Sequence, residues 1–324
     1  MNTSHDFPFA CKPDITVYDH GNSPRGFNSS LAEFVIEFKT ALNQDPFRHE
    51  LDSSANADPT INPFMETDPK GCETAGQIIV YATLLLGAQY RTHAFSVLII
   101  KDYARLIRWD RSGAIVTGPI YYETASHLSE FFIRYDLADR EARGHDTTVG
   151  PPSSEEEQAA RTIPELNHSE PLLSVNIQDS RSQESRRFII SRTTSVQNNI
   201  PVGRRTRISI AYDVKTAKRV LIKDSWRVLL EGIEPEGEIY AVLHREKVPN
   251  IAHCSLAGDV GDETYHRTRT DQFAGKYGFV SQIVPHRHYR LVLDTIGEDI
   301  KKFKYTKQMF RAVYAALRGA LTRS

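Results

Sequence analysis

Two carboxylates and a lysine near the N-terminus have the types and spacing of a metal-dependent catalytic site. Asp14 follows a proline in KPDITVYD, and Glu37 and Lys39 end the apolar run AEFVIEFK. Side chains alternate between the two faces of a strand, so Glu37 and Lys39 share a face. With Asp14 on an adjacent strand, the carboxylates can hold Mg²⁺ while the lysine orients water or stabilises developing charge. The same residues also fit a solvated strand face, with Asp14 in an Asx-type turn.

A helix farther along the chain adds two polar side chains to this pattern. Gln77 and Tyr81 stand four residues apart in GQIIVYA and therefore lie on one face of the predicted helix. Together, D…E-x-K and Q-x-x-x-Y resemble nucleases of the PD-(D/E)XK fold. The resemblance implies an N-terminal α/β domain over residues 1–137. It also implies that Asp14, Glu37, Lys39 and Gln77 are catalytic residues and that Asp14 and Glu37 are metal ligands.

A second candidate site lies in the C-terminal half. Lys223 ends the apolar run RVLI, which predicts a strand, after another predicted strand over 205–214 and the short connection KTAK. Pro235 and the acidic residues after it predict a helix start, and Glu238 lies beside the apolar stripe of that helix. Because a half-buried lysine needs a partner, we expect Lys223 and Glu238 to form an ion pair. A strand-end lysine that reaches solvent fits the same spacing.

The order of these elements resembles the small lobe of a protein kinase. In that lobe a lysine on the third strand contacts nucleotide phosphates and pairs with a glutamate of the next helix. The residues VLIK resemble the V-A-I-K element, and EIYAVLHREKVPNI resembles the helix and the turn after it. The resemblance implies that Lys223, Glu238 and Gly203 bind nucleotide and that Leu291–Asp294 enters the hinge. It also implies ATP and Mg²⁺ as cofactors.

Longer motifs, in the same order along the chain, are similar to those of the fungal-type protein kinase family. They are GQIIVYA, RTHAFSVLI, YARLIRWDRSGAIVT, RGHDTTV, PVGRRTR, KDSWR, EGEIY, RTRT and HYRLVLD. The resemblance covers residues 70–324, most of the chain. It implies a serine/threonine-type protein kinase domain.

The chain departs from the kinase pattern in two places. The segment VGRRTR holds one glycine, Gly203, where G-x-G-x-x-G has three, although Arg204 and Arg205 could supply charge to a phosphate. No H-R-D and no D-F-G triad occurs in the 324 residues, so the proton-accepting and metal-binding residues of a kinase are missing from them. The 324 residues are then a fragment of a longer product, a truncated gene model, or a chain that has lost the activity. In each case we expect these residues, as a truncated pseudokinase, to bind nucleotide weakly or to serve as an interaction module. Metal-dependent nuclease activity of the N-terminal domain is the alternative.

The chain divides by composition into three segments, residues 1–137, 138–186 and 187–324, which must position these residues. Together they predict an α+β protein. Residues 138–186 are rich in Pro, Ser, Glu, Gln and Arg, which predicts an exposed linker. Within it, SEEEQAART is expected to form a short helix with Ser154 as N-cap and Glu157 completing a capping box. Residues 187–324 are expected to form the small lobe, the hinge and the first helix of a large lobe, an amphipathic helix over 306–324.

Two further expectations concern strands of this last segment. Ile208, Ile210 and Tyr212 alternate with polar neighbours, which predicts a half-buried strand with these side chains on its inner face. His286 and His288 alternate on one strand face without a cysteine or carboxylate close by in the sequence. We expect these two histidines to be polar residues of an edge strand.

Bulk composition excludes several classes of protein. Forty Lys and Arg residues against 41 Asp and Glu residues give a formal net charge of −1, so no basic excess predicts a nucleic-acid-binding chain. The three cysteines form no C-x-x-C pair, which argues against a disulfide framework or a zinc ribbon. No signal-peptide pattern is visible, and the apolar runs are too short to span a bilayer. We expect an intracellular protein, cytoplasmic or nuclear, with protein partners, no membrane, and nucleic acid only under the nuclease alternative.

Overall fold

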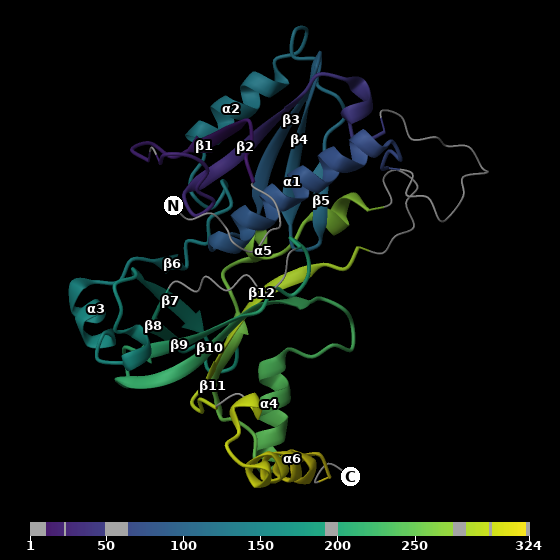
Figure 1. Ribbon diagram of the computed structural model, residues 1–324. Helices are drawn as coiled ribbons and strands as arrows, with labels where there is room; N and C mark the ends of the chain where they lie inside the picture. The colour runs from purple at the N-terminus through teal and green to yellow at the C-terminus, as the bar shows by residue number, and fades with distance from the viewer. Residues whose placement is uncertain are drawn as a thin grey trace. The chain divides into compact units, whose positions relative to one another are not determined.

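The computed structural model describes residues 11–22, 24–48, 64–191, 200–274, 283–297 and 300–321 (Figure 1). Its contacts divide the chain into two units that interleave along the sequence. The first unit comprises Met1–Thr147, Thr194–Arg205 and Asp262–His286, and the second comprises Thr148–Thr193, Thr206–Gly261 and Arg287–Ser324. Each unit has its own β-sheet together with helices, which confirms the expected α+β class.

A five-stranded mixed sheet forms the centre of the first unit, in the order β1-β2-β3-β4-β5. Its strands are β1 (Ile15–Tyr18), β2 (Ala32–Lys39), β3 (Ala94–Ile100), β4 (Tyr103–Asp110) and β5 (Gly113–Val116). β2 and β3 are parallel, and the other neighbours are antiparallel. Parallel neighbours need a crossover connection, which helix α1 (Pro69–Ala88) provides here.

Helices cover both faces of this sheet. α1 packs on one face and α2 (His127–Leu137) on the other, as Figure 1 shows. Successive strand residues therefore join different cores, since Val97 packs with the α2 residues and Leu98 with the α1 residues. The unit also contains the short helices η1 (Leu42–Gln44), α5 (Glu263–His266) and η3 (Thr270–Phe273).

By length and composition alone, α1 could cross a membrane, contrary to the expectation that every apolar run is too short. Most of its apolar window is buried inside the first unit, as in the core helix of a globular unit. The helix begins in the usual way, with Asp68 accepting a hydrogen bond from the backbone N–H of Lys70 (2.8 Å) and Pro69 at the first helical position. Burial against the five-stranded sheet therefore accounts for the apolar composition of this helix.

A seven-stranded sheet forms the second unit, in the order β11-β12-β10-β9-β8-β7-β6. Its strands are β6 (Val149–Gly150), β7 (Leu172–Gln178), β8 (Ser185–Ser191), β9 (Arg207–Asp213), β10 (Lys218–Val228), β11 (Cys254–Asp259) and β12 (His286–Leu293). Its helices are α3 (Ser154–Ala160), η2 (Pro164–Leu166), α4 (Glu236–Arg245), η4 (Ile300–Lys302) and α6 (Thr306–Leu321). The amphipathic helix expected over 306–324 is confirmed as α6, and residues 322–324 lie outside the described residues.

The segment 138–186 is ordered and is not an exposed linker. It contains α3, η2, β7 and the start of β8. Leu172, Val175 and Ile177 of β7 are buried. The prediction failed because polar composition outweighed these few apolar residues, which become buried once β7 pairs with β8.

The short helix in this segment is confirmed, but its cap lies one residue earlier than expected. Ser153 Oγ accepts a hydrogen bond from the backbone N–H of Glu156 (3.2 Å), and Glu156 Oε2 accepts one from the backbone N–H of Ser153 (2.8 Å). The capping box therefore consists of Ser153 and Glu156, not Ser154 and Glu157. Two adjacent serines and three adjacent glutamates make both registers compatible with the sequence.

The two faces of β9 are buried differently from the prediction. Ile208 is 56% exposed, whereas Ala211 and Asp213 on the other face are buried. Ile210 and Tyr212 are half-buried and pack against the core cluster formed around α3 and η2. Alternation alone could not reveal that this strand is covered on both faces.

The two histidines of VPHRHYR do not lie on an edge strand. β12 is an interior strand between β11 and β10, and His286 and His288 are buried. The ring of His288 stacks on the ring of Trp226, with centroids 4.9 Å apart and an interplanar angle of 3°. Both histidines therefore make their polar contacts inside the protein, His286 with Ser112 and His288 with Asp224.

Candidate functional site

The first unit brings together the carboxylates, lysine and glutamine that the N-terminal pattern predicts. Lys39 Nζ lies 2.7 Å from Glu37 Oε1 and 2.8 Å from Gln77 Oε1. Asp14 Oδ2 accepts a hydrogen bond of 2.8 Å from the backbone N–H of Phe38, the residue between Glu37 and Lys39. The four predicted residues meet at the end of β2, against which α1 packs.

Strand alternation and strand pairing produce this arrangement. Glu37 and Lys39 are two residues apart on β2 and so lie on the same face. Asp14 directly precedes β1, in which Ile15 pairs with Ile36. The antiparallel register therefore brings Asp14 alongside the end of β2.

Tyr81 joins this cluster from the next turn of α1. Burial, the Glu37 carboxylate, the Cys11 thiol and the Asp14 carboxylate all raise the pKa of Tyr81. Burial also raises the pKa of the Cys11 thiol. Both groups therefore stay protonated near neutral pH.

One oxygen of Glu37 is the unusual atom of the cluster. Glu37 is 5% exposed, and its buried Oε2 forms no well-oriented hydrogen bond with the described residues, although the Tyr81 hydroxyl lies close to this carboxylate. A buried polar atom without a partner costs free energy, and most such atoms in proteins are satisfied. Carboxylate and amide oxygens are ligands that Mg²⁺ prefers, so Asp14, Glu37 and Gln77 are suitable donors for a divalent cation.

In the second unit, Lys223 pairs with a glutamate of α4, but the glutamate is Glu236. The Nζ atom lies 2.5 Å and 2.8 Å from the two carboxylate oxygens of Glu236. The side chains of Lys223 and Glu236 are 23% and 26% exposed. An ion pair between this strand and this helix is thus present, but the prediction of Glu238 as the partner is wrong.

The start of α4 explains which glutamate is selected. The backbone N–H of Gly237 donates a hydrogen bond of 2.9 Å to Tyr289 Oη. A Cβ atom at Gly237 would collide with the side chains of Ala257 and Tyr289. This close approach fixes the first turn of α4 against β11 and β12, and Glu236, the first residue of the helix, then meets Lys223.

The glycine predicted for a phosphate-binding loop belongs to the first unit by its contacts, whereas Lys223 belongs to the second. Gly203 has φ +91°, a conformation that favours glycine. Its N–H donates a hydrogen bond of 2.8 Å to the carbonyl oxygen of Arg111, and Arg111 Nη1 donates one of 3.0 Å to the carbonyl oxygen of Pro201. The described part of this loop is therefore tied to Arg111 of the turn after β4.

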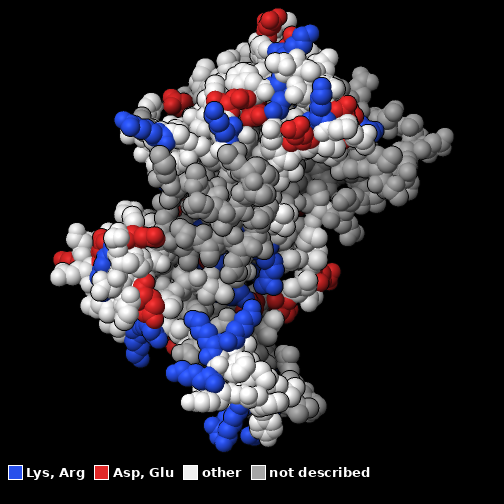
Figure 2. Space-filling model, in the orientation of Figure 1, with Lys and Arg blue, Asp and Glu red and all other residues white. Residues whose placement is uncertain are grey.

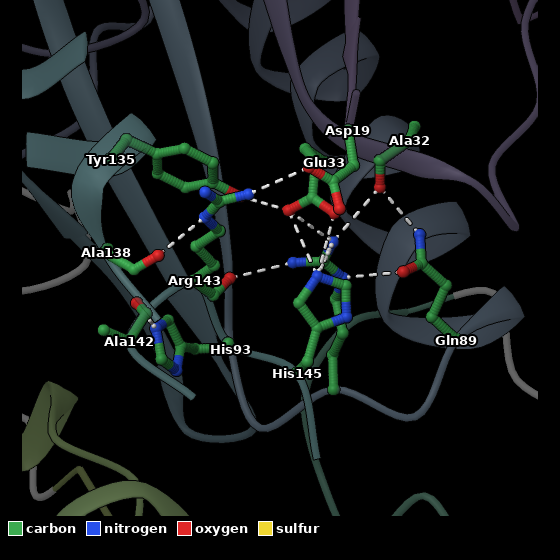
Figure 3. Close-up of polar contacts among 12 residues, drawn as sticks. Asp19, Ala32, Glu33, Gln89, His93, Tyr135, Ala138, Ala142, Arg143 and His145 are labelled. Carbon is green, nitrogen blue, oxygen red and sulfur yellow. Dashed lines mark hydrogen bonds and ion pairs between the residues drawn. The ribbon is translucent and has the colours of Figure 1, made fainter. Parts of the chain in front are cut away.

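A buried polar cluster of the first unit was not predicted from the sequence (Figure 3). Glu33 of β2 accepts hydrogen bonds from His145 Nε2 (2.9 Å) and Tyr135 Oη (2.8 Å) and forms an ion pair with Arg91 Nη2 (3.3 Å). Arg91 Nε also donates to Gln89 Oε1 (2.9 Å). The cluster ties β2, the segment before β3, α2 and the loop after α2 to one another.

Ionisation strengthens this cluster. Burial alone would raise the pKa of the Glu33 carboxyl, but the hydrogen bond from His145, the charge of Arg91 and the hydrogen bond from Tyr135 lower it to about 2. Burial lowers the pKa of His145, and Arg91 lowers it further against the opposing effect of Glu33. Near neutral pH, Glu33 is therefore charged and His145 is neutral.

The turn after β4 holds another buried polar contact within the first unit. Asp110 Oδ1 accepts a hydrogen bond from Thr270 Oγ1 (2.8 Å), and Asp110 Oδ2 accepts one from the backbone N–H of Arg269 (2.8 Å). Thr268 and Thr270 of the RTRT segment are both buried. This segment therefore anchors the region after β11 to the five-stranded sheet.

A third buried polar group lies in the second unit. Asp224 of β10 accepts hydrogen bonds from His288 Nε2 (2.9 Å) and Arg290 Nε (2.7 Å), both on β12. Burial would raise the pKa of Asp224, but the charges and hydrogen bonds of His288 and Arg290 lower it strongly. Asp224 therefore stays ionised and links two interior strands.

These three groups come from the long motifs of the sequence. RTHAFSVLI supplies Arg91, RGHDTTV supplies His145, and YARLIRWDRSGAIVT supplies Asp110. KDSWR and HYRLVLD supply the network around Asp224. In RTHAFSVLI and YARLIRWDRSGAIVT, the available signal was the presence of charged residues inside otherwise apolar segments, whereas RGHDTTV is mostly polar. In neither case does the sequence say which residues meet.

The fold and the sites define an α+β protein of two units, with a lysine–glutamate pair that joins a strand to the helix after it. A family model described as fungal protein kinase matches residues 65–322, most of the chain. The chain therefore belongs to the fungal protein kinase family. No curated protein and no solved structure matches it.

Proposed function

We propose that the second unit is a kinase-type small lobe and that Lys223 and Glu236 form its nucleotide-facing pair. The observation that carries this proposal is the ion pair between Lys223 on β10 and Glu236 on α4, the next helix. Protein kinases use a lysine on the third strand of the small lobe and a glutamate of the next helix in this way. The order of the strands in the sheet supports the assignment. β8, β9 and β10 are consecutive neighbours, and β12 and then β11 lie on the far side of β10.

ATP and Mg²⁺ fit this unit only in part. Lys223 could supply one positive charge to the phosphates. The segment before β9 has Gly203 as its single glycine, and the 324 residues contain no H-R-D or D-F-G triad to hold a metal or accept a proton. We therefore propose that these residues bind nucleotide weakly, contribute to interactions with other proteins, and do not transfer phosphate by themselves.

Titration with a fluorescent ATP analogue, with and without Mg²⁺, tests the nucleotide site. Lys223→Met should weaken binding about tenfold, because it removes a charged hydrogen-bond donor. Lys218→Met is the matched control, since Lys218 is an exposed lysine at the start of the same strand, in which Lys223 is near the middle. Equal affinity of Lys223→Met and the unchanged chain would contradict the proposed site.

Phosphate transfer is tested separately with radiolabelled ATP and a general protein substrate. We expect no transfer above a reaction without protein, because positioning of metal and hydroxyl supplies most of phosphoryl-transfer catalysis. Transfer by the unchanged chain that disappears in Lys223→Met would contradict the proposed inactivity. It would leave the nucleotide site itself supported.

A specific observation favours a second candidate function for the first unit, which is metal-dependent cleavage of nucleic acid. Glu37 Oε2 is buried without a well-oriented hydrogen bond to the described residues, within the cluster of Asp14, Lys39 and Gln77. A divalent cation held by Asp14, Glu37 and Gln77 would satisfy that oxygen and could activate water or polarise a phosphate. Lys39 would then be placed to stabilise negative charge on the phosphate.

Cleavage of supercoiled plasmid DNA in Mg²⁺ or Mn²⁺ tests this candidate, with terbium luminescence as an independent readout of cation binding. Glu37→Ala should abolish both signals. Glu73→Ala, at an exposed carboxylate of the same helix as Gln77, should leave both unchanged. Absence of cation binding by the unchanged chain would rule the candidate out.

A further inference from the structure

Two histidines and an aspartate of the second unit meet where α4 ends against the sheet. The ring centroids of His244 on α4 and His253, which directly precedes β11, are 5.2 Å apart, and the two rings are tilted by 53°. His253 Nδ1 lies 2.7 Å from Asp294 Oδ2. The cluster is separate from the pair of Lys223 and Glu236, because Glu236 lies at the other end of α4.

Strand pairing and helical spacing build this cluster. β11 and β12 pair antiparallel, in a register that places His253, just before β11, beside Asp294, just after β12. The backbone N–H of Asp294 also donates a hydrogen bond of 2.9 Å to the carbonyl oxygen of His253. Tyr240 of α4 packs into the core cluster of β11 and β12. His244, one turn after Tyr240, therefore faces the same strands.

The hydrogen bond to Asp294 determines which nitrogen of His253 is available. A carboxylate accepts a hydrogen bond from a protonated ring nitrogen, so in the neutral ring Nδ1 carries the proton and Nε2 keeps its lone pair. His244 Nε2 is buried, and it has no hydrogen-bond partner in the part of the chain that the structure describes. A buried nitrogen without a partner costs free energy, which a ligand at that atom would recover.

We propose that His244 and His253 bind a divalent transition-metal ion such as Zn²⁺, with Asp294 as the residue that positions His253. Imidazole nitrogen is a preferred ligand of Zn²⁺, and histidines that bind metal usually donate their other ring N–H to a carboxylate or carbonyl oxygen. An ion with tetrahedral bonds of about 2.0–2.1 Å to both rings would hold their centroids about 5 Å apart, which agrees with the observed 5.2 Å.

Such an ion would join the last turn of α4 to the ends of β11 and β12. His244 is the ninth of the ten residues of α4. Cations near the C-terminus of a helix are stabilised by its dipole, so positive charge suits this position. Because the three residues meet only in the folded unit, Zn²⁺ should stabilise that unit whether or not it binds nucleotide.

Surface charge does not favour a cation in this part of the unit. In Figure 2, Lys and Arg gather where Figure 1 draws α6, which contacts the turn after α4 through the hydrogen bond from Asn250 to Ala315. We therefore attribute binding to the two imidazoles as ligands. Mg²⁺ and Ca²⁺ prefer oxygen ligands and should not compete, so Zn²⁺ should bind equally well in excess Mg²⁺.

Isothermal titration calorimetry with Zn²⁺ tests the site in a chain that carries Glu37→Ala, which removes the candidate cation site of the first unit. His244→Ala and His253→Ala should each weaken Zn²⁺ binding about tenfold or more, because each removes one of two ligands. Asp294→Asn should weaken it about tenfold, as expected when a metal-binding histidine loses its carboxylate. His168→Ala, at an exposed histidine of the same unit, is the control and should change nothing.

Bound Cu²⁺ gives an independent readout of the ligands. Imidazole also binds Cu²⁺, and each coordinated nitrogen splits the electron paramagnetic resonance signal of the ion. With one equivalent of Cu²⁺, the signal should show two imidazoles in the starting chain and one in His244→Ala or His253→Ala. Asp294→Asn should keep two imidazoles at lower affinity, which distinguishes a positioning residue from a ligand.

Three results would overturn the proposed site. They are the absence of Zn²⁺ binding, binding that is unchanged in His244→Ala or His253→Ala, and equal weakening in His168→Ala. Unchanged affinity in Asp294→Asn would overturn the role assigned to that carboxylate. Circular dichroism of each variant checks that α4 and the sheet are retained, so that weaker binding reports on the ligands themselves.

Discussion

Replacing Glu33 with glutamine should destabilise the first unit strongly and change its response to acid. Glu33 is 4% exposed and contacts Arg91, His145 and Tyr135. Glu33→Gln keeps the size of the side chain but leaves the buried guanidinium of Arg91 without its carboxylate. Removal of one partner from a buried ion pair is costly because the other charge stays buried.

The lowered pKa of Glu33 gives the magnitude. Folding lowers the pKa of this carboxyl from an ordinary value of 4.5 to about 2. Every tenfold drop in proton affinity corresponds to about 1.4 kcal/mol, so ionised Glu33 contributes about 3 kcal/mol to the free energy of unfolding. Because the folded pKa is the lower one, this contribution is complete above the ordinary pKa and is lost as the pH falls toward 2.

Urea unfolding measured from pH 7 to pH 3 tests this magnitude. Unfolding is followed by tryptophan fluorescence in a Trp226→Phe background. Trp109 is then the one remaining tryptophan of the sequence, and because it is buried in the first unit, its signal reports on the unfolding of that unit. Glu33→Gln should lower the free energy of unfolding at pH 7 by about 3 kcal/mol and flatten its decline below pH 5. Glu130→Gln, at a half-exposed carboxylate of α2, should change neither quantity. A loss below about 1 kcal/mol in Glu33→Gln, with an unchanged acid response, would refute the reasoning.

Two further substitutions test the packing and the polar contacts. Gly237→Ala should cost about 2 kcal/mol or more in chemical unfolding followed by circular dichroism, because its Cβ would collide with Ala257, whereas Gly76→Ala in α1 has open space and should be neutral or slightly stabilising. Thr270→Val should leave Asp110 without its hydroxyl partner, cost about 1–3 kcal/mol, and speed tryptic cleavage of the surrounding segment. Unchanged stability of either variant would contradict the close contact assigned to it.

Much of the fold could be predicted from patterns of neighbouring residues in the sequence. Alternation and apolar runs predicted β2 around Glu37 and Lys39, β10 around Lys223, and the amphipathic helix α6. These elements follow from residue types within a few positions of one another. The meeting of Asp14 with the end of β2 could be anticipated as well, since strand parity and one antiparallel pairing determine it.

The partner of Lys223 shows where local pattern is insufficient. Glu236 and Glu238 are both acidic residues in the first turn of α4, and sequence gives no reason to prefer the first. The choice depends on the close approach of Gly237 to Tyr289, more than 50 residues away. A contact over that distance in sequence is invisible to periodicity.

The buried polar groups could not be predicted for a related reason. Glu33 and His145 are more than 100 residues apart, and nothing near either one indicates the other. Charged residues are rarely buried without partners, so sequence alone favours placing them on the surface. The same bias hid β7, because its polar surroundings resembled those of an exposed linker.

The measurement that tests the central proposal most directly compares two neighbouring glutamates. Affinity for a fluorescent ATP analogue is measured for the unchanged chain, Glu236→Gln and Glu238→Gln. If Glu236 orients Lys223 toward the nucleotide, Glu236→Gln should weaken binding about tenfold, and Glu238→Gln should leave it unchanged. Weakening by Glu238→Gln alone, or equal affinity of all three chains, would contradict the assignment of Lys223 and Glu236 as the nucleotide-facing pair.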